Sequence, residues 1–562
     1  LNVSPSFDAE DRSLTIELDG NSLKPEDLIK CKDPGVFIKL SDHAIEKVKK
    51  SRRLLEDKLN SDEKVYGVNT GFGNFAEVVI PKQQQKKLQL NLIRSHAVGV
   101  GPPLPPHQAR MLLALRINVL AKGHSGISVE VLQQLIDAFN AYCVSWVPEQ
   151  GTVGCSGDLC PLAHLALGLM GEGKMWSPET GWAQASEVLE KHSLKPIVLH
   201  FKEGICLING TQMITTLGVE ATLKARATAL QADVVGALTL EVAKGNKKAF
   251  LPDIHQLRPH SGQIAVARRI RNLLPCQLRQ PSTLAQANKK QRPVQDPYVL
   301  RCIPQVHGIV HDTIEFTYNI LGTEINSATD NPLVLWDKGK VVSCGNFHGE
   351  YPSKALDYLA IAVSELAQIS ERRIERLVNP ALSNGLPAFL IKEGGLNSGF
   401  MMMQVTAASL VSENKVLCHP ASADNITTSA SQEDHVAMGG FSARKALQVV
   451  RNVQKVIAIE LLAACQAMEF FKPLTTTEPL QKVYEMVRTV SQPLDEDRCM
   501  AGDIEAVAKL IERGKVWECV LPCVKAHENT AVEELDYEDS LEMLPEYFPP
   551  SRFVSINGKH SS

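Results

Sequence analysis

The sequence has few aromatic residues, no long apolar run and no marked excess of charge. Phe, Tyr and Trp make up 5% of its 562 residues, which favours helices packed through alanine and leucine over a β-sandwich. With 59 basic and 63 acidic residues the formal net charge is −4, so we expect no basic face for nucleic acid. Because no apolar run reaches the roughly 18 residues of a membrane helix, we expect no membrane span, and the N-terminus shows no signal-peptide pattern.

The 13 cysteines form no CxxC pair and no other disulfide or zinc pattern. We therefore expect reduced thiols that pack as small hydrophobic side chains, and a cytoplasmic protein. His307 and His311 share a helical face and could bind a metal ion. No third ligand accompanies them in the sequence, so we expect no metal site.

Apolar residues at helical spacing dominate the chain after a short strand at 14–18 and a charged helix at 44–59. Long helices are expected at 212–244, 355–378 and 441–471. Their wide apolar faces indicate a large helical bundle and an oligomer. The stretch 276–297, rich in Gln, Pro, Lys and Arg, is expected to be a long loop.

We expect a peripheral N-terminal segment (1–32), an N-terminal domain (33–208), a central helical-bundle domain (209–527) and a polar C-terminal tail (528–562).

A glycine-rich segment precedes a short apolar helix. Gly151, Gly154 and Gly157 are three residues apart, and Asp158 and Pro161 follow as expected N-cap and first-turn residues of that helix. The spacing is neither GxGxxG nor GxxxxGK[ST], so a phosphate-binding loop is disfavoured. A tight turn into a buried helix is the simplest interpretation.

Backbone cyclisation is a more specific interpretation of the same segment. Gly157 lacks a Cβ, so its amide nitrogen can approach the carbonyl carbon of Cys155 in a tight turn. Ring closure with loss of two waters, one from Ser156, would leave an exocyclic methylidene, which is a strong electrophile. A helix N-terminus just downstream would stabilise negative charge on such a ring.

Gly154–Pro161 resembles the signature of the aromatic amino acid ammonia-lyases, whose Ala-Ser-Gly triad forms 4-methylideneimidazol-5-one (MIO). Further segments between about Asp33 and Cys523 resemble motifs of that family in order. They are VYGVNTGFG at 65–73, SHA at 95–97, LINGTQ at 207–212, VQDPY at 294–298, LRC at 300–302, GNFHGE at 345–350, SERRIER at 370–376 and SQEDH at 431–435.

The resemblance implies a mainly α fold of the fumarase/aspartase-like superfamily, with an MIO-loop N-terminal domain and a long central helical bundle. It also implies a homotetramer whose active sites are built from three subunits. The prosthetic group would be MIO formed from Cys155, Ser156 and Gly157, with no external cofactor.

The same resemblance assigns roles to individual residues. Tyr66, on a mobile glycine-rich loop, would be the general base, and Arg301 would clamp the substrate α-carboxylate through its bidentate fork. The remaining side chains would orient the carboxylate and the MIO oxygen or wall the pocket. They are Asn209, Gln295, Tyr298 and Phe347.

Two further positions indicate the substrate. Glu433 offers a carboxylate to an imidazole N–H, and His96 offers a second polar contact. Phenylalanine-specific relatives are apolar where His96 stands and carry Gln where Glu433 stands. A buried Glu433 without a partner would disfavour a phenyl ring. The expected reaction is therefore elimination of ammonia from L-histidine to give trans-urocanate, the first step of histidine degradation.

Two residues depart from the family pattern, since Cys155 and Cys160 stand where Ala is usual. Only the backbone carbonyl of residue 155 enters the ring, so cyclisation remains chemically feasible. An MIO-dependent aminomutase and a catalytically inactive tetrameric binding protein remain as alternatives.

Overall fold

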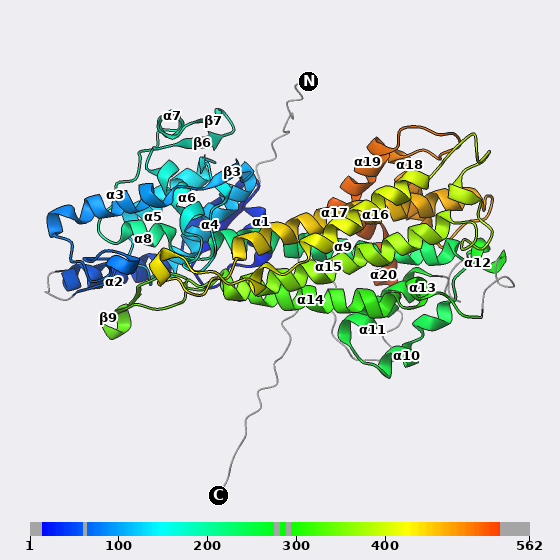
Figure 1. Ribbon diagram of the computed structural model, residues 1–562, viewed down its shortest axis with the longest axis horizontal. Helices are drawn as coiled ribbons and strands as arrows, with labels where there is room; N and C mark the ends of the chain where they lie inside the picture. Colours follow the sequence, from blue (N-terminus) through cyan, green and yellow to red (C-terminus); the bar gives the residue numbers. More distant parts are fainter. Residues whose placement is uncertain (1–13, 60–63, 275–281, 288–293, 529–562) are drawn as a thin grey trace, which may run out of the picture. The chain divides into compact units, whose positions relative to one another are not determined.

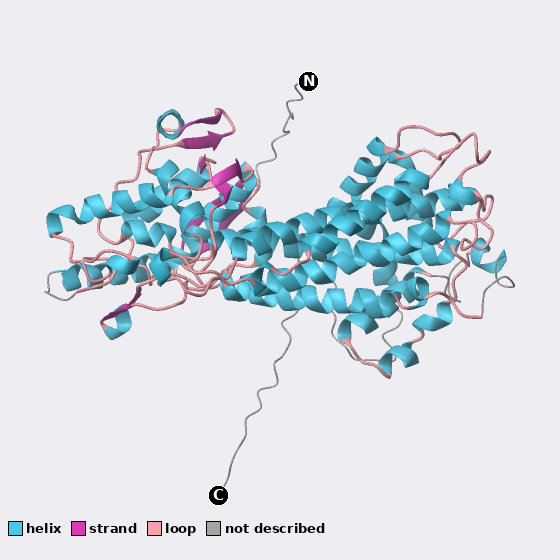
Figure 2. Ribbon diagram, viewed as in Figure 1, coloured by secondary structure: helices cyan, strands magenta, loops and turns pink. Residues whose placement is uncertain are grey.

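The computed structural model describes residues 14–59, 64–274, 282–287 and 294–528. These residues group into two compact units, both dominated by helices (Figures 1 and 2). Unit 1 comprises the described residues within Leu1–Leu223, Phe316–Ile361 and Lys415–Val450; unit 2 comprises those within Lys224–Glu315, Ala362–Asn414 and Arg451–Ser562. The expectation of a mainly α fold is confirmed.

Most helices belong to one unit. Unit 1 holds α1 (Pro25–Lys30), α2 (Asp42–Leu59), α3 (Gln85–His96), α4 (Pro106–Ala121), α5 (Val129–Asn140), α6 (Leu159–Leu169), α7 (Ala185–Lys191) and α8 (Glu203–Ile208). Unit 2 holds α10 (Pro252–Gln256), α11 (Ser261–Leu273), α12 (Thr283–Ala287), α13 (Tyr298–Arg301), α18 (Glu478–Val490), α19 (Ala501–Glu512) and α20 (Lys515–Glu528). Five long helices contribute residues to both units: α9 (Gln212–Val242), α14 (Ile303–Glu324), α15 (Glu350–Val378), α16 (Met401–Leu417) and α17 (Gly439–Glu469).

The described strands are short and all lie in unit 1, where they pair in small sheets of two or three strands. They are β1 (Leu14–Leu18), β2 (Val36–Leu40), β3 (Val100–Pro103), β4 (Val144–Ser145), β5 (Pro148–Gln150), β6 (Lys174–Ser177), β7 (Gly181–Gln184), β8 (Leu333–Leu335) and β9 (Lys340–Val342). β1 and β2 pair in parallel with Leu14 opposite Val36, whereas β3–β5, β4–β6–β7 and β8–β9 are antiparallel.

Helix α4 forms the centre of unit 1. Its residues from Gln108 to Ala121 are all buried, so this part of the helix exposes no face to solvent. Two arginines are buried with it, and their charges are solvated by backbone carbonyls. Arg110 donates to the carbonyl of Val36 at 2.7 Å, and Arg116 donates to the carbonyl of Asn209 at 2.8 Å. Arg116 therefore anchors a residue of the expected site to the core.

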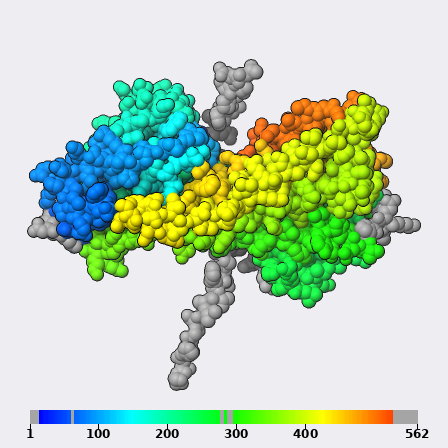
Figure 3. Space-filling model, in the orientation of Figure 1, coloured from blue at the N-terminus to red at the C-terminus, as the bar shows by residue number. Residues whose placement is uncertain are grey.

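Segments distant in sequence complete unit 1. Residues 415–450, yellow in the space-filling view, lie against the blue N-terminal surface of the same unit (Figure 3). The backbone amide of Met438 donates to the carbonyl of Val153 at 2.7 Å, so the start of α17 is bonded to the glycine-rich segment.

Unit 2 is a helical bundle with a buried polar centre. Arg373 of α15 binds Glu460 of α17 with both side chains fully buried. Asp233 of α9 binds His307 and His311 of α14 at 2.7 and 3.0 Å. These histidines do share a helical face, and both rings face one carboxylate. The described residues contain no cluster of His, Cys, Asp and Glu suited to a metal ion.

The predicted secondary structure is largely confirmed. β1 occupies Leu14–Leu18, and the helices expected at 44–59, 212–244, 355–378 and 441–471 are α2, α9, α15 and α17. Helix α9 ends at Val242 because Lys244 takes the left-handed conformation at φ 62°. The Gly245 amide then bonds to the Leu240 carbonyl at 2.8 Å, in the pattern of a Schellman cap.

One loop prediction is wrong in part. The described portion of 276–297 contains helix α12, Thr283–Ala287, whose start is held by the Thr475 carbonyl, which accepts from Leu284 N at 3.2 Å. Residues 276–281 and 288–293, and the tail after 528, lie outside the described residues. The four-segment division of the chain stays a prediction. In the described residues, none of the helices combines the length and apolarity needed to cross a bilayer.

Candidate active site

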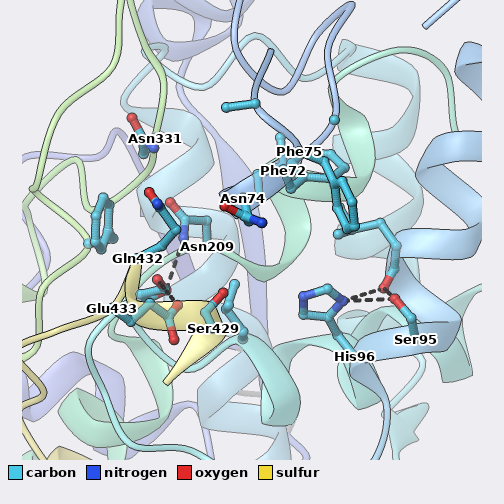
Figure 4. A pocket seen from close by; sticks show the side chains of 18 of the residues that line it. Phe72, Asn74, Phe75, Ser95, His96, Asn209, Asn331, Ser429, Gln432 and Glu433 are labelled. Carbon is cyan, nitrogen blue, oxygen red and sulfur yellow. Dashed lines mark hydrogen bonds between the residues drawn. The ribbon is translucent and has the colours of Figure 1, made fainter. Parts of the chain in front are cut away.

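A cavity of about 1290 Å³ lies in unit 1, and the glycine-rich segment forms part of its wall (Figure 4). Its lining comes from widely separated stretches of the chain. Of the residues expected in the site, those that line the cavity are Tyr66, His96, Cys155, Ser156, Gly157, Asn209, Phe347 and Glu433. The structure therefore brings eight sequence-predicted residues to one place.

The triad segment is folded into a tight turn. Gly154 and Gly157 have φ of 74° and 69°, and a bridge pairs Cys155 with Gly157. A Cβ on Gly157 would lie 2.2 Å from the Gly210 carbonyl oxygen, so only glycine fits there. The absent Cβ and the tight turn are the conditions expected for cyclisation.

The starts of several helices converge on this turn. The Gly349 amide, next to the start of α15, donates to the Gly154 carbonyl at 2.9 Å. Met438 N, before α17, bonds to Val153 in the same way, and α6 begins two residues after Gly157. The positive ends of these helix dipoles favour negative charge on the atoms of the turn.

Asp158 caps a different helix from the one expected. Its side chain makes no cap to α6, and its Oδ2 accepts from the Ile214 amide in the first turn of α9 at 2.9 Å. The expectation that Asp158 caps the following helix is therefore wrong, because the tight turn directs the side chain toward α9. Burial raises the pKa of Asp158 to about 7, although amide hydrogen bonds from Ile214 and Met213 oppose the shift.

Asn209 lies beside the triad on the same wall. Its Nδ2 donates to the Ser156 carbonyl at 2.9 Å. Its Oδ1 is buried and has no hydrogen-bond partner among the described residues. A buried amide oxygen without a donor is costly, so a donor from a ligand in the cavity would satisfy it.

The two unusual cysteines are both buried. Burial, together with the nearby charge of Glu433, raises the pKa of the Cys155 thiol to about 11. Burial also raises the pKa of Cys160. Both groups are therefore neutral thiols at neutral pH, and a neutral thiol is a poor nucleophile.

Tyr66 reaches the cavity from a glycine-rich loop. Its hydroxyl accepts a hydrogen bond from the Gly73 amide at 3.1 Å, and its ring packs edge-on against Phe72 at 6.3 Å between centroids. These contacts fold the loop back on itself and hold the phenol at the cavity wall.

His96 is the last residue of α3, and its side chain lines the cavity. Its Nδ1 lies 2.8 Å from the Leu92 carbonyl, which can only accept, so Nδ1 carries the hydrogen of the neutral ring. Nε2 is then the acceptor presented by this residue. In Figure 4, His96 and Ser95 lie across the pocket from Glu433 and Asn209.

Glu433 is half-buried on the opposite wall and bonded to the triad. Its Oε1 accepts a short hydrogen bond from the Ser156 hydroxyl, and its Oε2 accepts from Thr428 Oγ1 at 2.6 Å. Burial raises the pKa of Glu433, but the hydrogen bonds from Ser156, Thr428 and Cys155 outweigh it, so the net pKa is lowered. A carboxylate is therefore present in the cavity at neutral pH.

Three predicted residues are not in the cavity lining. Gln295, Tyr298 and Arg301 belong to unit 2, where Tyr298 is 71% exposed. The Arg301 guanidinium stacks 4.7 Å from the Tyr298 ring centroid, so the two side chains face the same way on one turn of α13.

Sequence reasoning missed two threonines of the site. Thr152 Oγ1 accepts from the Gly154 amide at 3.0 Å and donates to the Gly157 carbonyl at 3.2 Å, which clamps the triad turn. Thr428 holds Glu433. Their neighbours in sequence gave no periodic or charge signal that distinguishes them from other loop threonines.

The chain belongs to the aromatic amino acid lyase family, which it matches over residues 23–489. Among curated proteins it is similar to histidine ammonia-lyase of Caenorhabditis elegans, with 61% identity over 92% of this chain and 76% of that protein. The crystal structure of histidine ammonia-lyase from Trypanosoma cruzi is 52% identical, covers 94% of this chain and 100% of that one, and gives a TM-score of 0.84. The crystal structure of tyrosine aminomutase from Streptomyces globisporus is 35% identical in sequence. It covers 91% of this chain and 99% of that one, with a TM-score of 0.84.

Proposed function

We propose that this chain is a histidine ammonia-lyase, which converts L-histidine to trans-urocanate and ammonia as the first step of histidine degradation. The observation that carries the proposal is the cavity in which the triad meets Tyr66, Asn209, His96 and Glu433. The relatives of that name described above support it, at 61% and 52% identity.

The residues present fit an MIO group formed from Cys155, Ser156 and Gly157. Ring closure joins Gly157 N to the Cys155 carbonyl carbon, and the carbonyl oxygen leaves as water with the amide hydrogens of Ser156 and Gly157. The Ser156 hydroxyl and Cα hydrogen leave as the second water. The missing Cβ at Gly157 and the donor from Asn209 to the Ser156 carbonyl suit this product. The Cys155 side chain would remain on the ring outside the reaction.

When formed, MIO supplies an electrophile that makes the substrate amine a leaving group. The chain's own residues then bind and orient the substrate. Asn209 Oδ1 offers an acceptor to a ligand N–H, and Tyr66 takes the β-proton as general base. Phenols ionise near pH 10 in water, so the site has to favour transfer of the β-proton to Tyr66.

Glu433 and His96 are the proposed recognition groups for imidazole. The carboxylate of Glu433 accepts the ring N–H, and His96 offers a second polar contact on the other side of the pocket. A phenyl ring offers no N–H to the Glu433 carboxylate, so it would cover that charge without supplying a hydrogen bond, which disfavours phenylalanine.

We further propose a homotetramer whose sites are completed by other subunits. Gln295, Tyr298 and Arg301 are the proposed contribution of a second subunit, with Arg301 as the carboxylate clamp. Their absence from the cavity lining and the 71% exposure of Tyr298 support this assignment. A cytoplasmic location is proposed with it, on the ground that the described cysteines are free thiols.

Two alternatives are less well supported. An aminomutase would use the same group and return the amine to the β-carbon, but the similarity to the aminomutase above is lower, at 35% identity. An inactive binding protein is favoured only by Cys155, whose carbonyl, and not its thiol, is needed for the ring.

The proposal is tested by incubating purified protein with L-histidine and measuring urocanate, ammonia and β-amino acid together. Equal amounts of urocanate and ammonia are expected, and the Ser156→Ala variant should produce neither. A β-amino acid product would establish the aminomutase instead. No product from a correctly folded wild-type protein would contradict both enzyme assignments.

A further inference from the structure

The two carboxylate oxygens of Glu433 have different partners. Oε2 accepts from the Thr428 hydroxyl at 2.6 Å, and Oε1 accepts from the Ser156 hydroxyl. The Ser156 hydroxyl is the group that leaves when the triad loses its second water. Loss of that hydroxyl therefore frees Oε1 and leaves Oε2 bound to Thr428.

Thr428 is rigidly joined to Glu433. The Thr428 amide donates to the Glu433 carbonyl at 3.0 Å, and the Glu433 amide donates back to the Thr428 carbonyl at 3.3 Å. Three of the four residues between them, Ser429, Ala430 and Ser431, have φ of 53°, 51° and 66°, a strained conformation for residues with a Cβ. The side-chain bond and the two backbone bonds together hold this loop closed.

We propose that Thr428 is a positioning residue for imidazole recognition, which fixes Glu433 through Oε2 so that Oε1 faces the substrate once Ser156 has lost its hydroxyl. This inference rests on the proposed function and deepens it, because it names a residue that determines the affinity for histidine. Cys155 also touches Glu433, but a thiol is a weak donor. Thr428 is thus the remaining hydroxyl donor to Glu433 among the described residues.

Two substitutions separate the hydroxyl from the shape of the side chain. Thr428→Val keeps the branched side chain and removes the donor, whereas Thr428→Ser keeps the donor. Thr427→Val is the matched control, because Thr427 is the exposed neighbouring threonine. Binding is measured by calorimetry with L-histidine in the Ser156→Ala background, where no turnover occurs and Oε1 has no serine donor.

We expect Thr428→Val to raise the Kd for L-histidine about tenfold in that background, the size of effect of a hydrogen bond to a charged group. Thr428→Ser and Thr427→Val should each leave the Kd within about twofold of its value in the Ser156→Ala background. An unchanged Kd in Thr428→Val overturns the inference and leaves the proposed function in place. Absence of histidine turnover by the wild-type protein would overturn the proposed function itself, and the inference with it.

The pH profile gives a second readout that a merely structural role would not move. The groups that face Glu433 are His96 of α3, Cys155 and Ser156 of the triad and Thr428 of its own loop. Removing the Thr428 hydroxyl removes one cause of the low Glu433 pKa, so the acid limb of kcat/KM should move to higher pH. The limb should stay in place in Thr428→Ser, and an unmoved limb in Thr428→Val would contradict the inference.

Discussion

Asp158 Oδ2 accepts a hydrogen bond from the Ile214 amide at 2.9 Å, which bonds the triad turn to the first turn of α9. The residue after the triad thus caps a helix that begins 54 positions further along the chain, at Gln212. The contact fixes Gly157 beside Gly210, where the turn has no room for a Cβ.

Asp158 should make stability depend on pH in an unusual direction. Its folded pKa is raised from 3.8 to about 7 by burial, so the folded state holds a proton that the unfolded chain releases between these values. The contribution of Asp158 to the free energy of unfolding is fully present below pH 3.8 and is lost as the pH rises through about 7. Asp158→Asn cannot release a proton, so its melting temperature relative to wild type should rise over that interval. A difference that does not vary with pH would contradict the assignment.

Gly157→Ala should prevent ring formation. The new Cβ would lie 2.2 Å from the Gly210 oxygen, and φ of 69° is unfavourable for alanine. The expected result is an unmodified triad peptide by mass spectrometry and no histidine turnover. Gly322→Ala is the control, because nothing lies within 4 Å of its Cβ in helix α14. A dehydrated triad in Gly157→Ala would show that the close approach to Gly210 is not required.

Glu433→Gln should weaken histidine turnover far more than folding. Gln keeps the size of the side chain but removes the charge that binds the imidazole N–H. We expect kcat/KM to fall about 10- to 100-fold, as for a lost hydrogen bond to a charged group. Asp434→Asn, at an exposed neighbouring position, should stay near wild type. Steady-state kinetics with L-histidine checks both variants, and unchanged kinetics in Glu433→Gln would remove the basis of the substrate assignment.

Arg373→Met should destabilise unit 2 without a direct effect on the cavity residues. Arg373 contacts both oxygens of Glu460, at 2.5 and 2.8 Å, and both side chains are fully buried. Without its partner Glu460 is an unpaired buried charge, which costs about 3–5 kcal/mol. Lys455→Met is the control, because the side chains of Lys455 and its partner Glu505 are 42% and 57% exposed, and the loss of this pair should cost at most about 1 kcal/mol. Equal losses of unfolding free energy in the two variants would contradict the argument.

The sequence predicts the long helices well, because each has a repeating pattern of apolar residues at helical spacing. α9, α15 and α17 follow from apolar spacing, and their ends lie within a few residues of the expected positions. The exact end of α9 could not be predicted, since Lys244 rather than Gly245 takes the left-handed conformation. The position of the helix end depends on the hydrogen bond from the Gly245 amide to the Leu240 carbonyl, which residue propensities do not predict.

The sequence indicates eight of the residues that line the cavity, but not the contacts between them. Glu433 and Ser156 are 277 positions apart, and no local pattern indicates that they touch. Resemblance to a family identifies such residues without giving the hydrogen bonds between them. Thr428 was missed for the same reason, because its role is defined by a loop closed in space. The buried Arg110 and Arg116 likewise find carbonyl partners on remote segments.

The mass of the proteolytic peptide that spans Cys155–Gly157 tests the central claim most directly, with the Ser156→Ala peptide as reference. If the triad cyclises as proposed, the wild-type peptide is two waters lighter than its sequence requires, whereas the Ser156→Ala peptide cannot lose the serine water. A wild-type peptide of unmodified mass would mean that the chain has the lyase fold without the electrophile. In that case the elimination mechanism is wrong for this protein, and a binding role for the cavity takes its place.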